Sequence, residues 1–234
     1  MKKSTKLSAF TLIELLIVIA VIGILAGMLF PAIKAVMNSA QGTRVANNGK
    51  QIVTAITSAN IDREQNSKGD IWPSINKWSG DGGANKYFSS IMGNNEKGRV
   101  ELTGISVSMF AGGGVDAAQD AKELETKGNI WNMLAGISAS DDNTPFIWTR
   151  NGDGIEAADF NTAVGTEAGW GDKLKSGETP FSDQQLVLAR KGASFQIIKV
   201  KDLTSDSFLA STTNDTSTIE VCKAVAGEAE DTDY

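Results

Sequence analysis

The carboxylate of Glu14 has the clearest chemical consequence of any side chain, because it lies at the start of a long apolar stretch. The residues from Leu15 to Ile33 carry no charge. In a helix, which rises about 1.5 Å per residue, this stretch would be roughly 28 Å long, close to the hydrocarbon thickness of a bilayer. A carboxylate at the edge of such a segment costs about 3 kcal/mol in lipid unless a cation pairs with it. The position of Glu14 therefore predicts a charged partner.

The residues in front of Glu14 form a second pattern. Lysines lie at positions 2, 3 and 6, and residues 8–15 read SAFTLIEL. This string resembles the processing site of type IV prepilins and type II secretion pseudopilins. In that family a prepilin peptidase removes a short basic leader immediately before a phenylalanine. The new amino group is N-methylated, and the apolar helix is kept.

The resemblance implies a cut between Ala9 and Phe10, with N-methylation of Phe10. Glu14 then becomes the fifth mature residue. The family has a glutamate there, which is thought to pair with the N-terminal amine of a neighbouring subunit. An amine and a carboxylate inside a bilayer each need such a partner, since each is costly alone. The family usually has glycine before the cut, so Ala9 predicts slower cleavage.

The resemblance covers about residues 1–60 and includes Pro31, where the family commonly has a helix kink. Proline removes one helix hydrogen bond and bends the shaft. Pro31 is therefore, with Glu14, a predicted assembly residue. The resemblance also implies the partners: the prepilin peptidase, other pilin or pseudopilin subunits, the inner-membrane assembly platform with its ATPase, and membrane lipid.

Two simpler interpretations compete with this one. An ordinary secretory signal peptide has an apolar core of only about 7–15 residues, which is shorter than the stretch found here. A plain anchor would hold a periplasmic binding module that does not polymerise, and it would have no use for Glu14. The sequence therefore favours a structural subunit of a type II secretion pseudopilus or type IV pilus-like filament, with the anchored binding module as the alternative.

The charge balance limits the partners and sets the orientation. The chain has 22 basic and 28 acidic residues, a net charge of −6, and loss of the leader would leave 19 basic against 28 acidic residues. Phosphate binding needs clusters of Lys and Arg, so no nucleic acid partner is expected. The basic leader predicts a cytoplasmic N-terminus. We expect a single-pass protein of the bacterial inner membrane, with its C-terminal domain in the periplasm or in an extracellular filament.

The residue inventory argues against an enzyme. Histidine is absent, which removes the commonest general base and zinc ligand. Cys222 is the only cysteine, so the chain can form neither an intramolecular disulfide nor a thiol–histidine pair. We expect Cys222 to be a buried small side chain. Within the family, the absence of a disulfide is more typical of pseudopilin-like members.

One segment resembles part of a calcium loop. Residues 151–156 read NGDGIE, which places oxygen ligands on Asn151, Asp153 and Glu156 and a glycine at the bend. Calcium is therefore the one cofactor with a sequence signal, although the glutamate that closes a full calcium loop is missing. The alternative is a simple pair of Asn-Gly and Asp-Gly turns.

One long helix must position the N-terminal residues. After a leader at residues 1–9, residues 10–33 are apolar on every side and predict the membrane-spanning or filament-core half of this helix. Residues 34–62 have apolar positions at spacings of three, four and seven, which predict an amphipathic half. The remainder divides into a globular α+β head at residues 63–227 and an acidic tail at residues 228–234.

The head is predicted to mix short helices with strands. The patterns indicate helices at residues 85–92 and 130–134, strands at 99–110 and 145–149, and a hairpin of residues 186–191 and 194–200. The predicted class is α+β. The resemblance implies a type IV pilin-like fold, in which the long N-terminal helix packs on a C-terminal antiparallel β-sheet.

Overall fold

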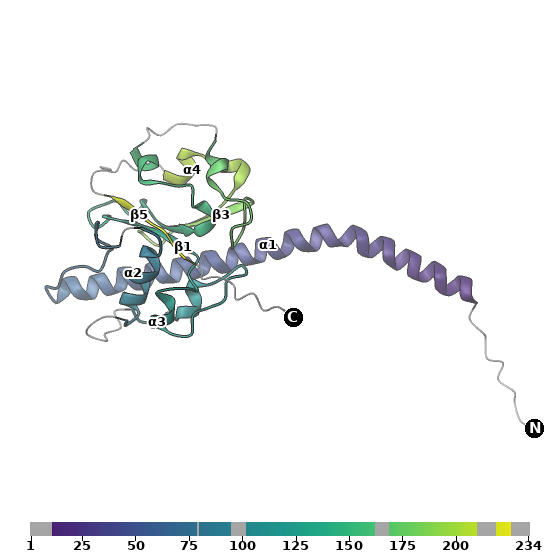
Figure 1. Cartoon of the computed structure of the whole chain (residues 1–234), viewed down its shortest axis with the longest axis horizontal. Coiled ribbons are helices and arrows are strands. Elements are labelled where there is room, and N and C mark those ends of the chain that lie inside the picture. The colour runs from purple at the N-terminus through teal and green to yellow at the C-terminus, as the bar shows by residue number, and fades with distance from the viewer. Residues whose placement is uncertain (1–10, 79, 95–101, 162–168, 210–218, 226–234) are drawn as a thin grey trace, which may run out of the picture. The chain divides into compact units, whose positions relative to one another are not determined.

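The computed structural model describes residues 11–78, 80–94, 102–161, 169–209 and 219–225 (Figure 1). The chain divides into two units, residues 1–40 and residues 41–234. The helix α1, Leu12–Gln65, contributes to both. The predicted long N-terminal helix is therefore confirmed, and it extends slightly beyond its expected end. It continues through Pro31 without interruption.

The part of α1 that belongs to the second unit is amphipathic. Val45, Ile52 and Ile56 are among its buried side chains, and their spacing keeps them on one side of the helix. The opposite side is polar and exposed, and it includes Asn47 and Lys50. The head therefore covers only one side of this stretch of helix.

Two glycines of α1 lie close to the sheet. A Cβ atom at Gly49 would be only 2.7 Å from Cη2 of the buried Trp131 ring. A Cβ atom at Gly42 would be 2.8 Å from Nε2 of Gln185, the far end of a flexible side chain. Gly49 is thus required by a rigid neighbour, whereas Gly42 faces one that can move.

The head contains a five-stranded antiparallel sheet in the order β4-β3-β2-β1-β5. The strands are β1 Trp131–Ala135, β2 Pro145–Thr149, β3 Gln185–Arg190, β4 Phe195–Lys199 and β5 Glu220–Cys222. This confirms the α+β class with an antiparallel sheet. It also confirms the predicted strand at residues 145–149 and the hairpin, which is β3–β4.

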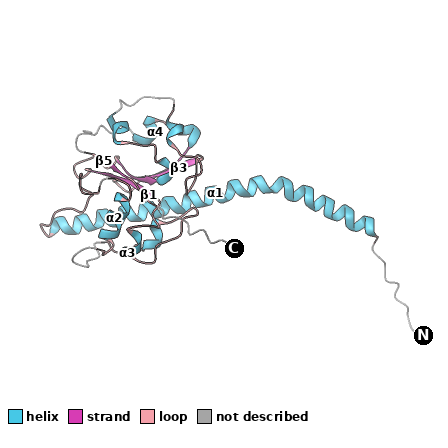
Figure 2. Ribbon diagram, in the orientation of Figure 1, coloured by secondary structure: helices cyan, strands magenta, loops and turns pink. Residues whose placement is uncertain are grey.

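Both faces of the sheet are covered (Figure 2). Trp131 pairs with Thr149 in the register of β1 and β2, and its ring packs against α1. Trp148 points to the opposite face, where its ring centroid lies 5.6 Å from that of Phe208 in α4, Ser205–Leu209. Every residue of β1, β2 and β3 is buried as a result.

The remaining helices are short. The helix α2, Gly83–Ile91, confirms the prediction for residues 85–92. The single turn α3, Ala121–Leu124, begins where Asp120 accepts a hydrogen bond from the Glu123 amide. The 3₁₀ turns are η1 Val107–Phe110, η2 Arg150–Gly152, η3 Ala157–Asn161, η4 Trp170–Lys173 and η5 Val200–Asp202.

Two predictions for the middle of the head were wrong. The described part of the strand expected at residues 99–110 is irregular and ends in η1; only its Leu102 and Phe110 are buried. The turn of helix expected at residues 130–134 is instead the strand β1. A strand that is covered on both faces has no apolar–polar alternation, so its sequence resembles that of a buried helix.

Candidate assembly site

The first turn of α1 holds the carboxylate of Glu14 against Thr11. Oε2 of Glu14 accepts a hydrogen bond from the Thr11 amide at 2.8 Å and from the Thr11 hydroxyl at 2.6 Å. The Glu14 amide lies 3.4 Å from the Thr11 hydroxyl oxygen, to which it donates. This reciprocal arrangement is a capping box, with Thr11 at the N-cap and Glu14 three residues later.

The capping box satisfies the hydrogen-bonding needs of one carboxylate oxygen but not the charge. No described residue forms an ion pair with Glu14. The local hydrogen bonds fix where the carboxylate points, because both come from Thr11. The geometry thus presents a fixed anion at the N-terminal end of an apolar helix. Thr11 is not among the predicted site residues, although the spacing Thr-x-x-Glu before an apolar run is a sequence signal for such a cap.

The apolar part of α1 is uncovered within the chain. Among the described residues, α1 is the one helix long and apolar enough to span a membrane; its most apolar window has a mean hydropathy of 2.8 and none of it is buried. Leu12 is 81% exposed and Phe30 is 73% exposed. Burying such side chains is worth roughly 1.5–3 kcal/mol each, so contact with lipid or with other helices would stabilise this surface.

The other predicted N-terminal residues are placed less fully. Ala9 and Phe10, which flank the predicted cut, lie outside the described residues. Pro31 lies within the continuous helix, and the kink expected there stays a prediction. Thr11 is the first described residue and is two positions after the predicted cut, so the capping box would be kept in a processed chain.

The three residues of the predicted calcium loop have different surroundings. The buried side-chain amide of Asn151 donates to the carbonyl oxygens of Ser182 at 2.6 Å and Gln185 at 2.8 Å, while its Oδ1 has no described partner. Glu156 is exposed, and its backbone amide donates to Asp159 at 2.8 Å. The described residues contain no group of three or more Asp, Glu, Cys or His side chains that could hold a metal ion. The calcium site stays a prediction.

Asp153 is held by two lysines that are distant in sequence. Its carboxylate pairs with Lys175 and, at 3.1 Å, with Nζ of Lys223. Burial acts to raise the pKa of Asp153, but the hydrogen bonds and the positive charges of these two lysines together outweigh burial and hold the pKa below its ordinary value. No local pattern predicts these partners, because they come from other parts of the chain. The pair with Lys223 ties the loop after β2 to the residue after β5.

Cys222 is buried, as expected. Burial raises the pKa of its thiol to about 12, and the nearby charge of Glu220 acts in the same direction. A thiol with this pKa is almost entirely protonated at neutral pH and is a poor nucleophile. Cys222 therefore belongs to the core of the sheet.

Comparison with known proteins adds two findings. Residues 6–30 match the model of the prokaryotic N-terminal methylation motif. The chain is also similar to a type IV major alpha-pilin of Moraxella bovis, with 33% identity over 159 residues that cover 64% of this chain and 89% of that protein. No solved structure matches. The aligned length of 159 residues exceeds the 65 residues that precede the end of α1, so the similarity extends into the head.

Proposed function

Since the chain belongs to the family of type IV pilin-like proteins, we propose that it is a structural subunit of a membrane-assembled filament. The observation that carries this proposal is the uncovered apolar length of α1 with a fixed carboxylate at its start. A bundle of such helices would cover the apolar surface of each copy. A simple anchor would need the apolar surface but not the carboxylate.

Processing by a prepilin peptidase is part of the proposal. The match to the methylation motif spans residues 6–30, which include the predicted cut between Ala9 and Phe10. Cleavage there would create an amine beside a lipid-embedded helix. The Glu14 carboxylate of a neighbouring copy would neutralise that amine, because both charges are costly when they are alone in lipid. The pairing would set the register between adjacent helices.

Apolar packing between the helices would determine the docking position of an incoming copy less than the ion pair of Glu14. Contacts between apolar side chains in lipid gain little over contacts with lipid tails. The ion pair is directional, so it would determine where an incoming copy docks. The assembly would take place in the inner membrane, on a platform driven by an ATPase, with the head in the periplasm.

The similarity to a major pilin supports a pilus as the product. A type II secretion pseudopilus is the alternative, because the same N-terminal chemistry serves both systems. Deletion of the gene separates the two. Loss of surface filaments with normal protein secretion would indicate a pilus, whereas loss of secreted enzymes from the medium would indicate a pseudopilus.

Substitution of Glu14 tests the proposal. We expect Glu14→Val to insert into the membrane as well as the native chain, or better, because a costly charge is removed. Its fraction in sheared filaments should fall at least about tenfold, the change that a loss of about 1.4 kcal/mol in docking would produce. The measurement compares the chain in sheared and membrane fractions of the same cells.

Thr11→Val is the matched control, because it removes the hydroxyl that caps α1 but leaves the carboxylate. If Glu14 only caps its own helix, Thr11→Val and Glu14→Val should reduce incorporation alike. The proposal requires a much larger loss for Glu14→Val. Equal entry of Glu14→Val and the native chain into filaments would refute the pairing. A native chain found only in membranes would favour the anchored binding module.

A further inference from the structure

A cavity of about 380 Å³ lies beside α1 in the second unit. One wall is a flank of the helix, and the other is the segment that follows η1. The side chains and backbone that line it belong to Gln41, Arg44, Val45 and Asn48 of α1, and to Ser108 and residues 111–117.

Glycines allow the second wall to lie close to the helix. A Cβ atom at Gly112 would be 3.0 Å from Cγ2 of Val45 in α1. Gly113 has a φ of +57°, and a Cβ atom there would be 2.0 Å from Cβ of Pro180. The wall is therefore fixed between α1 and the turn at Pro180, so the cavity is a built feature of the head.

Arg44 brings an unmatched charge to this cavity. It is exposed, and it forms no ion pair or hydrogen bond with any other residue that the structure describes. The guanidinium group presents a planar fork of donors that matches a carboxylate. Asp116, on the opposite wall, likewise has no ion-pair partner among the described residues. The cavity therefore has a cationic side on α1 and an anionic side on the loop.

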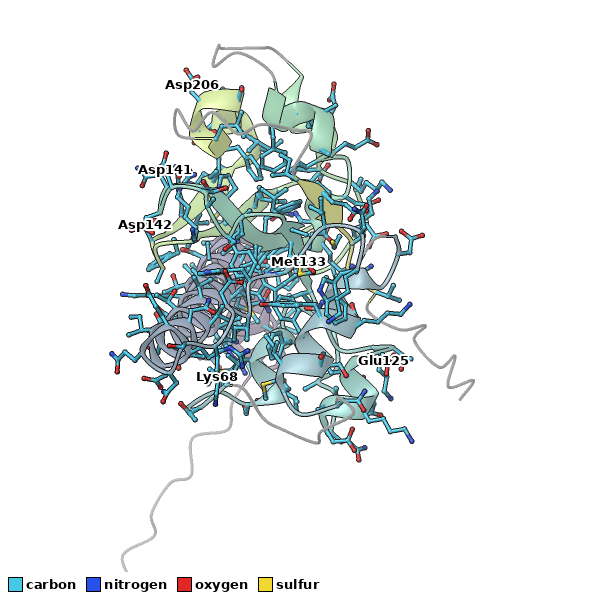
Figure 3. The ribbon with its side chains drawn as sticks, turned by 90° about the vertical axis from the view of Figure 1, so that its left-hand side faces the viewer. Lys68, Glu125, Met133, Asp141, Asp142 and Asp206 are labelled. Atoms are coloured by element: carbon cyan, nitrogen blue, oxygen red, sulfur yellow. The ribbon has the colours of Figure 1, made fainter. Side chains whose placement is uncertain are left out.

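The distribution of charge along the chain indicates where a carboxylate would come from. Between Glu14 and Asp62 the sequence contains no acidic residue, and its charged side chains are Lys34, Arg44 and Lys50. The sequence after α1 contains 25 acidic and 15 basic residues. Acidic side chains of the head project outward at its periphery, as Figure 3 shows for Asp141, Asp142 and Asp206. A helix of one copy and the head of another are thus of opposite charge.

We propose that this cavity is a docking site in which a carboxylate from the head of a second copy pairs with Arg44. The proposal rests on the proposed filament function, because parallel packing would bring the α1 of one copy beside the head of the next. Asp116 opposes an incoming carboxylate, so it would limit the strength of the contact. The pair would be a second, water-accessible ion pair between copies, separate from that of Glu14.

Zero-length cross-linking tests the contact directly. Carbodiimide joins amines to carboxylates but does not react with guanidinium groups, so the native chain cannot be linked at position 44. We expect Arg44→Lys to gain a cross-linked species of twice the chain mass, with position 44 joined to a head carboxylate in peptide mass spectra. Asn47→Lys is the matched control, because this exposed position of α1 does not line the cavity. The lysine at position 47 should not be joined to the head carboxylate that is joined to position 44.

Substitutions at Arg44 and Asp116, which have opposite charges, test whether the cavity binds an anion or a cation. Arg44→Glu should lower the fraction of chain in sheared filaments at least about tenfold. Asp116→Asn should leave that fraction equal or higher, because it removes the opposing charge while the shape of the wall is kept. If a cation docked in the cavity, both results would be reversed. If the cavity were purely structural, both variants would change the fraction of chain in sheared filaments to the same extent.

The outcomes separate this inference from the proposed function. Cross-linking is measured in the sheared and the membrane fractions. A link between copies at position 44 supports the contact, even if the chain is found only in the membrane, a result that would contradict the filament. The inference is overturned by an Arg44→Lys chain that enters filaments without this link, by a link only to Asp116 of the same chain, or by a link only to a different protein.

Discussion

At the scale of single residues, Glu14 and Asp153 differ in whether the partners that hold them are local in sequence. Glu14 is oriented by Thr11, three positions away, and no described residue forms an ion pair with it. Asp153 is neutralised by Lys175 and Lys223. Thr11 could be predicted as the partner of Glu14 from the spacing Thr-x-x-Glu, because a capping box is local. Lys175 and Lys223 could not be predicted as the partners of Asp153, because only folding brings these lysines close to it.

The ion pairs of Asp153 predict a pH-dependent contribution to stability. Because the pKa of Asp153 is lower in the folded state, its contribution is present above the unfolded pKa of about 3.9 and is lost as pH falls through the folded pKa. We expect Asp153→Asn to lower the free energy of unfolding by about 1 kcal/mol at pH 7, since the lysines are partly exposed. Denaturation of the full chain in detergent at pH 7 and pH 3 measures this.

Glu156→Gln is the control for that measurement, because Glu156 is exposed and its side chain forms no ion pair among the described residues. The difference between Asp153→Asn and the native chain should shrink at the lower pH, while the control stays near zero at both. A difference that is equal at both pH values would show that the charge of Asp153 does not stabilise the fold.

Calcium binding at Asn151, Asp153 and Glu156 remains a separate prediction. If calcium binds there, it must compete with Lys175 and Lys223 for Asp153. Millimolar calcium should then raise the Tm of the full chain by mass action, and Asp153→Asn should abolish the rise. Thermal melts in calcium and in chelator decide the matter. Identical Tm values in the two conditions would remove calcium from the account.

Cys222 is expected to be unreactive while the chain is folded. Its burial and raised pKa leave almost no thiolate at pH 8. A thiol reagent should therefore react at least about 100-fold more slowly with the folded chain in detergent than with the denatured chain. Equal rates in the two states would contradict the placement of Cys222 in the core.

At the scale of elements, the two glycines of α1 that face the head make a matched pair. Gly49→Ala should lower the free energy of unfolding by about 1–3 kcal/mol, because the new methyl group would overlap the buried Trp131 ring. Gly42→Ala meets only the flexible end of Gln185, so the gain in helix propensity of about 1 kcal/mol should offset the contact. Denaturant unfolding of both variants compares them. Equal destabilisation would contradict the packing described for Trp131.

The elements also show what sequence patterns can predict. The long helix, the helix near residue 85 and the β3–β4 hairpin follow from periodicity and a turn signal, which are local. The strand β1 has the sequence pattern of a buried helix because both of its faces are covered, which removes the apolar–polar alternation. The strand β5 was missed because its three residues are too short to show a pattern.

At the scale of the whole molecule, two kinds of surface have no partner within the described chain. The apolar part of α1 is uncovered, and its amphipathic part carries positive charge beside an acidic head. Membrane insertion satisfies only the first surface. A filament of identical or related copies, as we propose, would satisfy both, because the helices would cover one another and opposite charges would meet. This is why the filament explains more of the molecule than an anchor does.

The mature N-terminus of chains taken from sheared filaments tests the central claim most directly. Mass spectrometry should find the chain in the sheared fraction, without residues 1–9 and with N-methylated Phe10 as its first residue. An intact Met1, a cut after the apolar stretch such as near Ala26, or absence of the chain from sheared material would contradict the account.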